Sequence, residues 1–414
     1  MSVVTSAAEA AHPGPDRLSR RYVAGASMAS FGLFVALLTP LNITMALKVQ
    51  QVDPDGKAAS LSLVLGVAAF IGILVSPVAG RLSDRTGSRY GMRRPWLLGG
   101  MLTGTAGTYL VVLSDSIPRL LGAWCVAQVG YNVVLAALAA TLPDQVPPER
   151  RGALAGVFSL TQNASYIVGT FLPVVFAGIA LQFMVPALLG LVSVLVLVVL
   201  LRDRTLPSAG PKPRRRTTGL LWFDRRRHPD MGWAVCTRFL FCLSQAITLT
   251  YLPYLFTDHF GVAEAEVPWH VFLANLVFSL AAMAAALVCG VWSDRLGRRK
   301  VFVFGSAVLA SLGLLVIVLA PTPEWSLLGQ GLCGLGSGCF YAVDLALIVQ
   351  VLPSSDDVGK DLGVANVAAV LPQSVAPVFA PMLIAFGGYP LLFLAGALAG
   401  IVGALLVRRV RAAR

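Results

Sequence analysis

The sequence predicts an all-α polytopic membrane protein with twelve transmembrane helices in two pseudo-symmetric six-helix bundles. Hydrophobic residues make up 57% and charged residues only 13% of the 414 residues, a mixture outside the range of soluble globular domains. The apolar residues form runs of about 20, the length that crosses a hydrocarbon core of about 30 Å as a helix. A short charged motif also occurs twice, 210 residues apart, which indicates one unit in two copies.

Twelve apolar runs account for the predicted helices. Helices are required because lipid offers the backbone no hydrogen-bond partner, and the runs are too long and too evenly apolar for the strands of a barrel. The predicted spans are 22–47, 59–79, 95–114, 118–142, 152–178, 180–201, 232–256, 267–289, 300–320, 325–351, 361–386 and 388–407.

The basic residues predict the orientation of these spans. With the N-terminus in the cytoplasm, 28 of the 32 lysines and arginines fall on the cytoplasmic side, and only Lys48, Lys57 and Arg119 fall outside. This asymmetry predicts a multi-pass protein of the cell (plasma) membrane with both termini cytoplasmic. The net charge of +12 is therefore a topology signal and is poor evidence for binding to nucleic acid.

Composition also divides the chain into segments. Residues 1–21 lack an apolar core and are expected to form a disordered cytoplasmic tail, and residues 408–414 a second tail. Residues 202–231 contain two runs of three arginines among prolines and glycines, and dense like charge resists packing. We therefore expect a six-helix bundle at 22–201, a basic cytoplasmic linker at 202–231 and a second bundle at 232–407.

The repeated motif reads Gly80-Arg81-Leu82-Ser83-Asp84-Arg85-Thr86-Gly87 in the first copy and Gly290-Val291-Trp292-Ser293-Asp294-Arg295-Leu296-Gly297 in the second. Each copy lies in a polar interval between two spans, on the arginine-rich side. An aspartate at a helix end can accept bonds from backbone N–H groups or from nearby arginines. Such contacts can hold one conformation closed.

Two six-helix halves, a long basic central loop and this motif resemble the major facilitator superfamily. The first copy continues as Ser88-Arg89-Tyr90-Gly91-Met92-Arg93-Arg94-Pro95-Trp96, and this extension resembles the sucrose-transporter and glycoside-pentoside-hexuronide branch. The resemblance implies that the motif latches the cytoplasmic side by touching the opposite half in the outward-facing state. The alternative is that the arginines only enforce topology. The predicted gate residues are Gly80, Asp84, Arg85, Gly87, Arg89, Arg94, Gly290, Asp294, Arg295, Gly297 and Arg298.

Asp344 is the one acidic residue that falls well inside a predicted span. It lies seven residues before Val351, hence about 10 Å from the cytoplasmic end of its helix. Removal of water favours the neutral form of a carboxyl group, which suits a residue that takes up and releases a coupling proton. A structural partnership with a hydroxyl group or with Arg238, and direct contact with substrate, are the alternatives.

Other polar residues lie about halfway along apolar spans, where a shared cavity between two parallel repeats is expected. Amides and tyrosines both donate and accept hydrogen bonds, which fits a neutral polyhydroxylated small-molecule substrate. Each of them could instead join two helices. The predicted substrate-binding residues are Asn42, Tyr131, Asn132, Gln162, Asn163, Tyr166, Gln245, Asn275 and Gln373.

No catalytic arrangement is found. The sequence has no Ser/His/Asp set, no HExxH motif and no phosphate-binding GxxxxGK[ST] loop, and the six cysteines show no metal-ligand spacing. We therefore expect no enzyme activity, cofactor or metal, a drive from an ion or substrate gradient, and a monomer in the lipid bilayer. The fifth span lacks the Gly-Pro-x-x-Gly-Gly signature of drug-proton antiporters, which favours proton-coupled uptake of a sugar or other small polar solute. Efflux of a drug-like or secondary metabolite, and a non-transporting sensor or assembly factor, remain alternatives.

Overall fold

The computed structural model describes residues 19–146, 148–201, 203, 229–351, 365 and 367–410. Residues 1–18 of the predicted N-terminal tail, nearly all of the predicted basic linker and the last four residues lie outside the described residues, and the last two residues of that predicted tail, Arg20 and Arg21, already belong to the first helix. The helices of the N-terminal bundle are α1 (Arg20–Thr39), η1 (Pro40–Thr44), α2 (Met45–Val52), α3 (Lys57–Arg85), α4 (Arg94–Leu113), α5 (Ile117–Gln145), α6 (Pro148–Val175) and α7 (Ile179–Leu200). Those of the C-terminal bundle are α8 (Pro229–Tyr254), η2 (Leu255–His259), α9 (Val267–Leu296), α10 (Arg299–Leu319), α11 (Pro323–Gln350) and α13 (Pro372–Val407).

These helices confirm the predicted twelve spans. Among the described residues, ten continuous segments are long and apolar enough to cross a membrane. The helix α6 has 28 residues, enough to cross a membrane, but it is more polar than these ten segments. The segment Val367–Val407 has 41 residues, so a straight helix of that length would be about 60 Å long, twice the hydrocarbon core. It is two helices, because the backbone leaves the helical region at Gly387 and at Gly388, where φ is 67°.

The first helix of each bundle contains a proline followed by one wide π-helical turn. Pro40 opens η1 in the first bundle, and Pro253 lies just before η2 in the second. Proline has no N–H to donate to the preceding turn, so the hydrogen-bond ladder shifts to the wider i→i−5 spacing, as in the bond from Met45 N–H to the Pro40 carbonyl. Asn42 lies inside the first of these turns.

Glycines set how closely the helices pack within each bundle. A Cβ on Gly130 would lie 2.2 Å from the backbone nitrogen of Gly104, and a Cβ on Gly336 would lie 2.7 Å from that of Ala310. Only glycine permits these close approaches. The contact of Gly336 with Ala310 is the counterpart, 206 residues later, of the contact of Gly130 with Gly104. The charged motif at the ends of α3 and α9 repeats after 210 residues, so the repeat shifts by four residues between these helices. The stretch between Gly87 and Arg93 therefore holds four residues more than the stretch between Gly297 and Arg299, and the structural counterpart of Tyr131 is Ser337.

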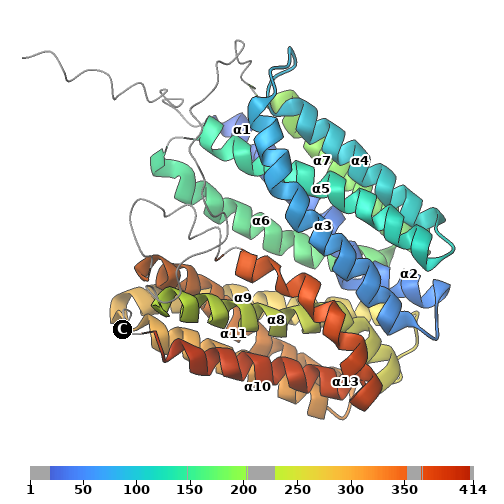
Figure 1. The fold of residues 1–414 in the computed structure, drawn as a ribbon, viewed down its shortest axis with the longest axis vertical. Helices are drawn as coiled ribbons and strands as arrows, with labels where there is room; N and C mark the ends of the chain where they lie inside the picture. The colour runs from blue at the N-terminus through green and yellow to red at the C-terminus, as the bar shows by residue number, and fades with distance from the viewer. Residues whose placement is uncertain are drawn as a thin grey trace, which may run out of the picture.

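The two bundles meet near one face of the molecule. The terminus face is the face that carries residues 19, 203 and 410, and the opposite face carries the loops 53–56, 114–116, 260–266 and 320–322. The bundles converge at the opposite face and diverge toward the terminus face (Figure 1). Tyr251 and Tyr254 of α8 belong to one hydrophobic core that residues of both bundles share, whereas the part of the second bundle near the terminus face has a core of its own.

Polar contacts between the bundles cluster at the same end. Lys57 Nζ lies 2.6 Å from Asp258 Oδ1, and the Tyr254 hydroxyl donates to the Ala46 carbonyl at 2.9 Å. The Ser62 and Tyr251 hydroxyls are hydrogen-bonded at 2.6 Å and are buried. The opposite face is therefore closed by direct contact between the bundles.

Candidate functional site

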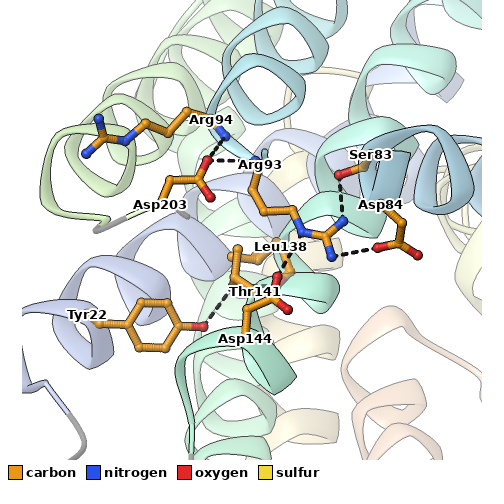
Figure 2. A network of polar contacts seen from close by, with 9 residues as sticks. All are labelled: Tyr22, Ser83, Asp84, Arg93, Arg94, Leu138, Thr141, Asp144 and Asp203. Carbon is orange, nitrogen blue, oxygen red and sulfur yellow. Dashed lines mark hydrogen bonds and ion pairs between the residues drawn. The ribbon is translucent and has the colours of Figure 1, made fainter. Parts of the chain in front are cut away.

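The first copy of the charged motif is organised around Arg93. Its side chain is only 5% exposed and donates to Asp84 Oδ1 at 2.6 Å, to Asp144 Oδ2 at 3.0 Å and to Ser83 Oγ at 2.8 Å (Figure 2). These partners come from the end of α3 and the end of α5. Charge-assisted bonds of this kind are stronger than neutral ones, so Arg93 ties three helix ends together.

Asp203 connects the same loop to the end of α7. Its Oδ2 atom accepts hydrogen bonds from the backbone N–H groups of Arg93 at 2.6 Å and Arg94 at 2.8 Å, at the start of α4 (Figure 2). A carboxylate in that position satisfies free N–H groups and interacts well with the helix dipole. Gly91 makes room for it: its φ is 105°, and a Cβ there would lie 2.3 Å from Asp203 Oδ2.

The predicted gate residues of the first copy divide into two groups. Asp84 is in the network, and the Arg94 side chain donates to the Leu201 carbonyl. Arg85 and Arg89 are exposed, and Arg89 lies 4.7 Å from the centre of the Tyr90 ring.

The glycines of that loop and three residues outside the predicted site differ from expectation. A Cβ on Gly80 or Gly87 would meet open space, so packing does not require glycine there. The residues that the sequence analysis left out of its site, Arg93, Asp144 and Asp203, carry most of the network. The only sequence signal for them was their place in short charged stretches beside a proline or at a helix end.

The described contacts of the second copy are bonds to backbone carbonyls. Arg299, which corresponds to Arg93 in the shifted repeat, donates from Nη1 to the Ala346 carbonyl of α11 at 2.9 Å. Lys300 donates to the Val410 carbonyl at 2.6 Å. Gly297 ends α9 with a φ of 62°, which favours glycine. Arg295 and Arg298 are exposed, and the side chain of Asp294 lies outside the described part of the chain. A Cβ on Gly290 would lie 4.0 Å from the Ala342 Cβ, so packing does not require glycine there.

Asp344 lies in the core of the second bundle beside Arg238. The Arg238 Nη1 atom is 3.2 Å from Asp344 Oδ2, and the two side chains are 14% and 2% exposed. Asp344 Oδ1 and Arg238 Nε have no hydrogen-bond partner among the described residues. A buried carboxylate costs several kcal/mol unless it is paired, so the guanidinium compensates the charge but leaves one carboxylate oxygen open. The pairing with Arg238 was the structural alternative raised by the sequence.

The ion pair belongs to a longer seam between α8 and α11. The Phe241 and Phe340 rings stack at 3.7 Å, and Cys242 Sγ is 3.8 Å from the Tyr341 hydroxyl oxygen. Gln245 lies two turns after Arg238, and Ser337 lies two turns before Asp344. Because the two helices are antiparallel, both residues lie about 10 Å beyond the ion pair, toward the opposite face.

Two atoms in that part of the seam are unpaired. Gln245 Nε2 and Ser337 Oγ are buried and have no partner among the described residues. Buried polar atoms without partners are costly, and in native proteins they are commonly satisfied by a ligand or by water.

In the first bundle, three of the predicted substrate-binding residues are engaged with their own helices or with neighbours in the bundle. Tyr131 is fully buried and bonds to the Thr108 hydroxyl at 2.7 Å. Asn132 donates to the Gln128 carbonyl at 2.9 Å and accepts from Ser76 at 3.1 Å. Asn42 donates to the Leu38 carbonyl at 2.7 Å within the π-helical turn. These contacts join or repair helices.

Most of the remaining predicted residues lie on helices of one bundle that are in contact with a helix of the other bundle. Gln162 of α6 and Gln373 of α13 are exposed halfway along their spans, although α6 packs on α9 and α13 packs on α3. Tyr166 lies 6.5 Å from the Phe278 ring across the interface, Asn163 is half-buried, and Asn275 of α9 is 5% exposed. Polar side chains at this depth of a membrane protein usually face the interior of the bundle or water.

Comparison with known proteins identifies the family. The family model of the Major Facilitator Superfamily matches residues 32–269 and 234–414. An uncharacterised MFS-type transporter of Mycobacterium tuberculosis is 25% identical over 357 residues, which cover 84% of this chain and 83% of the relative. The multidrug resistance protein MdtL of Escherichia coli is 30% identical over 181 residues, 41% of this chain and 44% of that protein.

A solved structure has the same fold. The crystal structure of a D-xylose-proton symporter superposes with a TM-score of 0.68 at 16% identity and covers 94% of this chain and 97% of that one. Its likeness concerns the arrangement of the helices. Together with the matched family model and the twelve helices in two bundles, these findings lead to one identification: this chain belongs to the major facilitator superfamily and is a multi-pass membrane transporter.

Proposed function

We propose that this protein is a proton-coupled importer of a sugar or other small polar solute, which works by alternating access between its two bundles. The observation that carries the proposal is the buried pair of Arg238 and Asp344, in which one carboxylate oxygen has no partner. An ionisable residue inside a membrane bundle is expensive and is usually functional. Asp344 has no acidic counterpart in the first bundle, where Leu138 occupies the equivalent position.

The charge distribution and the contacts between bundles together support an inward-open conformation. Among the described residues, most lysines and arginines lie at the terminus face, so the positive-inside rule assigns that face to the cytoplasm. The bundles touch at the opposite face, which is then the outer side. The latch that the family resemblance implies belongs to the outward-facing state, and the Asp84 side chain, paired with Arg93 but 59% exposed, can exchange that partner for one in the opposite half when the cytoplasmic side closes.

Protonation of Asp344 gives a physical route to coupling. The open Oδ1 atom can take a proton while Oδ2 still accepts from Arg238. Neutralising the carboxylate leaves the guanidinium buried without a counter-charge, a state that costs several kcal/mol. Water or substrate hydroxyls near the seam relieve that cost, so the protonation state biases the packing of α8 against α11 and with it the position of the bundles.

The polar groups available to a substrate are amides and hydroxyls. Gln162 and Gln373 are exposed at mid-depth, and Gln245 Nε2 and Ser337 Oγ are buried without partners. Such groups both donate to and accept from neutral hydroxyl groups. The function of the structural neighbour, D-xylose-proton symport, and the resemblance of the loop after Asp84 to the sucrose-transporter and glycoside-pentoside-hexuronide branch support a sugar-like solute.

Export of a drug-like compound is the second candidate function. It is favoured by the similarity of 181 residues to the multidrug resistance protein MdtL. The two candidates differ in the sign of the flux that a proton gradient drives, because a symporter moves solute with protons and an antiporter moves it against them.

Transport in proteoliposomes separates these functions. The purified protein is reconstituted with a panel of radiolabelled sugars and of fluorescent drug-like amines, under an imposed pH gradient of either sign. We expect sugar accumulation with the proton flux in the wild type and loss of gradient-driven accumulation in Asp344→Asn. The matched control is Asp115→Asn, which changes an exposed carboxylate at the opposite face. Unchanged gradient-driven accumulation in Asp344→Asn contradicts proton coupling through this residue, and amine movement against the proton flux favours export.

A further inference from the structure

An apolar groove runs along the lipid-facing side of the second bundle, near the terminus face. Its volume is about 450 Å³, within the range of sites for small ligands. Ala284, Ala285 and Val288 of α9 form one wall, and Val301, Phe302 and Gly305 of α10 form the other. Leu335 and Cys339 of α11 contribute to the floor. Val288, Val301 and Leu335 are exposed, so the groove is open toward the bilayer.

The groove follows from how α11 packs. A Cβ on Gly338 would lie 2.0 Å from the Ala282 carbonyl oxygen of α9, and a Cβ on Gly336 would lie 2.7 Å from the Ala310 nitrogen of α10. Both helices therefore pack closely on α11 and only weakly on each other, which leaves a trough between them.

The equivalent part of the first bundle has larger side chains. There Leu74 and Val75 stand at the positions of Ala284 and Ala285. The Trp96 indole also donates to the Thr86 hydroxyl at 2.8 Å across the same pair of helices. The trough is thus a feature of the second repeat.

Two arginines lie at the mouth of the groove. Arg295 is seven residues after Val288, hence on the same face of α9 and about 10 Å further toward the terminus face. Arg298 lies three residues before Val301 at the start of α10. Both side chains are exposed, and in the described part of the chain neither has a hydrogen bond or ion pair. The exposed Trp292 beside them suits the level of the lipid headgroups.

We propose that this groove binds an anionic phospholipid, with one acyl chain between α9 and α10 and the phosphate on Arg295 and Arg298. The walls offer hydrocarbon and almost no polar atoms, and the mouth offers two cations at headgroup depth, which is the distribution of chemistry in such a lipid. The bound lipid fills the space between two helices that scarcely touch, and so stabilises the second bundle. Each arginine removed should weaken lipid binding about five-fold, because the attraction of that basic side chain to the anionic headgroup is lost.

Lipid titration of the thermal unfolding midpoint in detergent tests this site. Phosphatidylglycerol and phosphatidylcholine with the same chains are added to the full-length protein, with glycerol phosphate as a soluble headgroup. We expect the wild type to gain more stability from phosphatidylglycerol than from phosphatidylcholine and nothing from glycerol phosphate. In Arg295→Gln/Arg298→Gln the half-maximal phosphatidylglycerol concentration should rise by more than ten-fold.

Two further variants make the test specific. Ala284→Leu/Ala285→Val copies the first repeat into the groove and should weaken the response to both lipids. Arg85→Gln removes the exposed arginine equivalent to Arg295 beside the filled trough and should leave both responses unchanged. The proposal is overturned if Arg295→Gln/Arg298→Gln retains the wild-type preference for phosphatidylglycerol, if Arg85→Gln abolishes that preference equally, or if glycerol phosphate alone reproduces the stabilisation.

Discussion

The two bundles share one fold but place their charges differently. In the first bundle Arg93 gathers Asp84 and Asp144 at the end of the helices, where the carboxylates are 59% and 25% exposed. In the second bundle Arg238 and Asp344 meet inside the core, and in the equivalent loop Arg299 and Lys300 donate to the backbone carbonyls of Ala346 and Val410. An ion pair near water is cheap and can be exchanged, whereas a buried pair is sensitive to one proton. The first bundle is therefore suited to latching and the second to coupling.

The largest expected effect comes from removing one member of the buried pair. Arg238→Met leaves the Asp344 carboxylate without compensation and should destabilise the protein by about 3–5 kcal/mol. The measurement is the thermal unfolding midpoint in detergent. The double variant Arg238→Met/Asp344→Leu should recover most of that loss and still fail to couple transport to protons. A double variant as unstable as Arg238→Met would show that the pair contributes packing rather than charge compensation.

A smaller effect is expected from the equivalent arginine of the first bundle. Arg93→Met should cost about 1–3 kcal/mol, because its partners are charged but can return to water. The neighbouring exposed residue Arg89 provides the control, and Arg89→Met should stay within about 0.5 kcal/mol of the wild type. If Arg93→Met is as damaging as Arg238→Met, the contrast between the bundles is wrong.

The connection from α7 to the first loop can be tested with one cap. Asp203→Ala removes the acceptor for two N–H groups at the start of α4 and should cost about 1 kcal/mol. The control is Asp55→Ala, which changes an exposed aspartate in the loop 53–56 at the opposite face. Equal unfolding midpoints for both variants would mean that the cap contributes nothing to stability.

The smallest effect on stability is expected at the opposite face. Lys57→Met breaks the bond to Asp258, whose side chain is 32% exposed, and such pairs contribute about 0–1 kcal/mol. That amount still shifts a two-state equilibrium by up to about five-fold. Alkylation of a cysteine placed at Glu264 should become faster in Lys57→Met. An unchanged rate would indicate that hydrophobic contacts, with Tyr251 and Tyr254 at their centre, close this face alone.

Hydropathy and charge spacing predict the helices well because lipid imposes one requirement on every span. The break at Gly387 and Gly388 coincides with the predicted boundary between 361–386 and 388–407. The burial of Asp344 inside its bundle was also predictable, since a single acid inside an apolar run stands out. Its partner could be named only as one alternative, because pairing depends on which faces of α8 and α11 meet.

Other features depend on tertiary contacts that no pattern records. Arg93 and Arg94 are adjacent and chemically identical, yet one is the centre of a network and the other reaches a carbonyl. Tyr131 and Gln162 both look like midplane polar residues, but Tyr131 joins α4 to α5 whereas Gln162 is exposed. The four-residue shift of the repeat arises from an insertion in a loop, which the 210-residue spacing of the motif does not reveal.

The most direct test of the account is the distance across the terminus face as a function of pH. Spin labels are attached at Arg89→Cys and Leu296→Cys, both exposed, one in each bundle, after replacement of the six native cysteines. Double electron–electron resonance then measures the separation of the labels in this cysteine-replaced background, both with Asp344 intact and with Asp344→Asn. We predict a population shift between two distances when the pH is varied, and one fixed distribution at all pH values with Asp344→Asn. The same pH-dependent shift in both proteins would contradict the proposal that protonation of Asp344 drives the movement of the bundles.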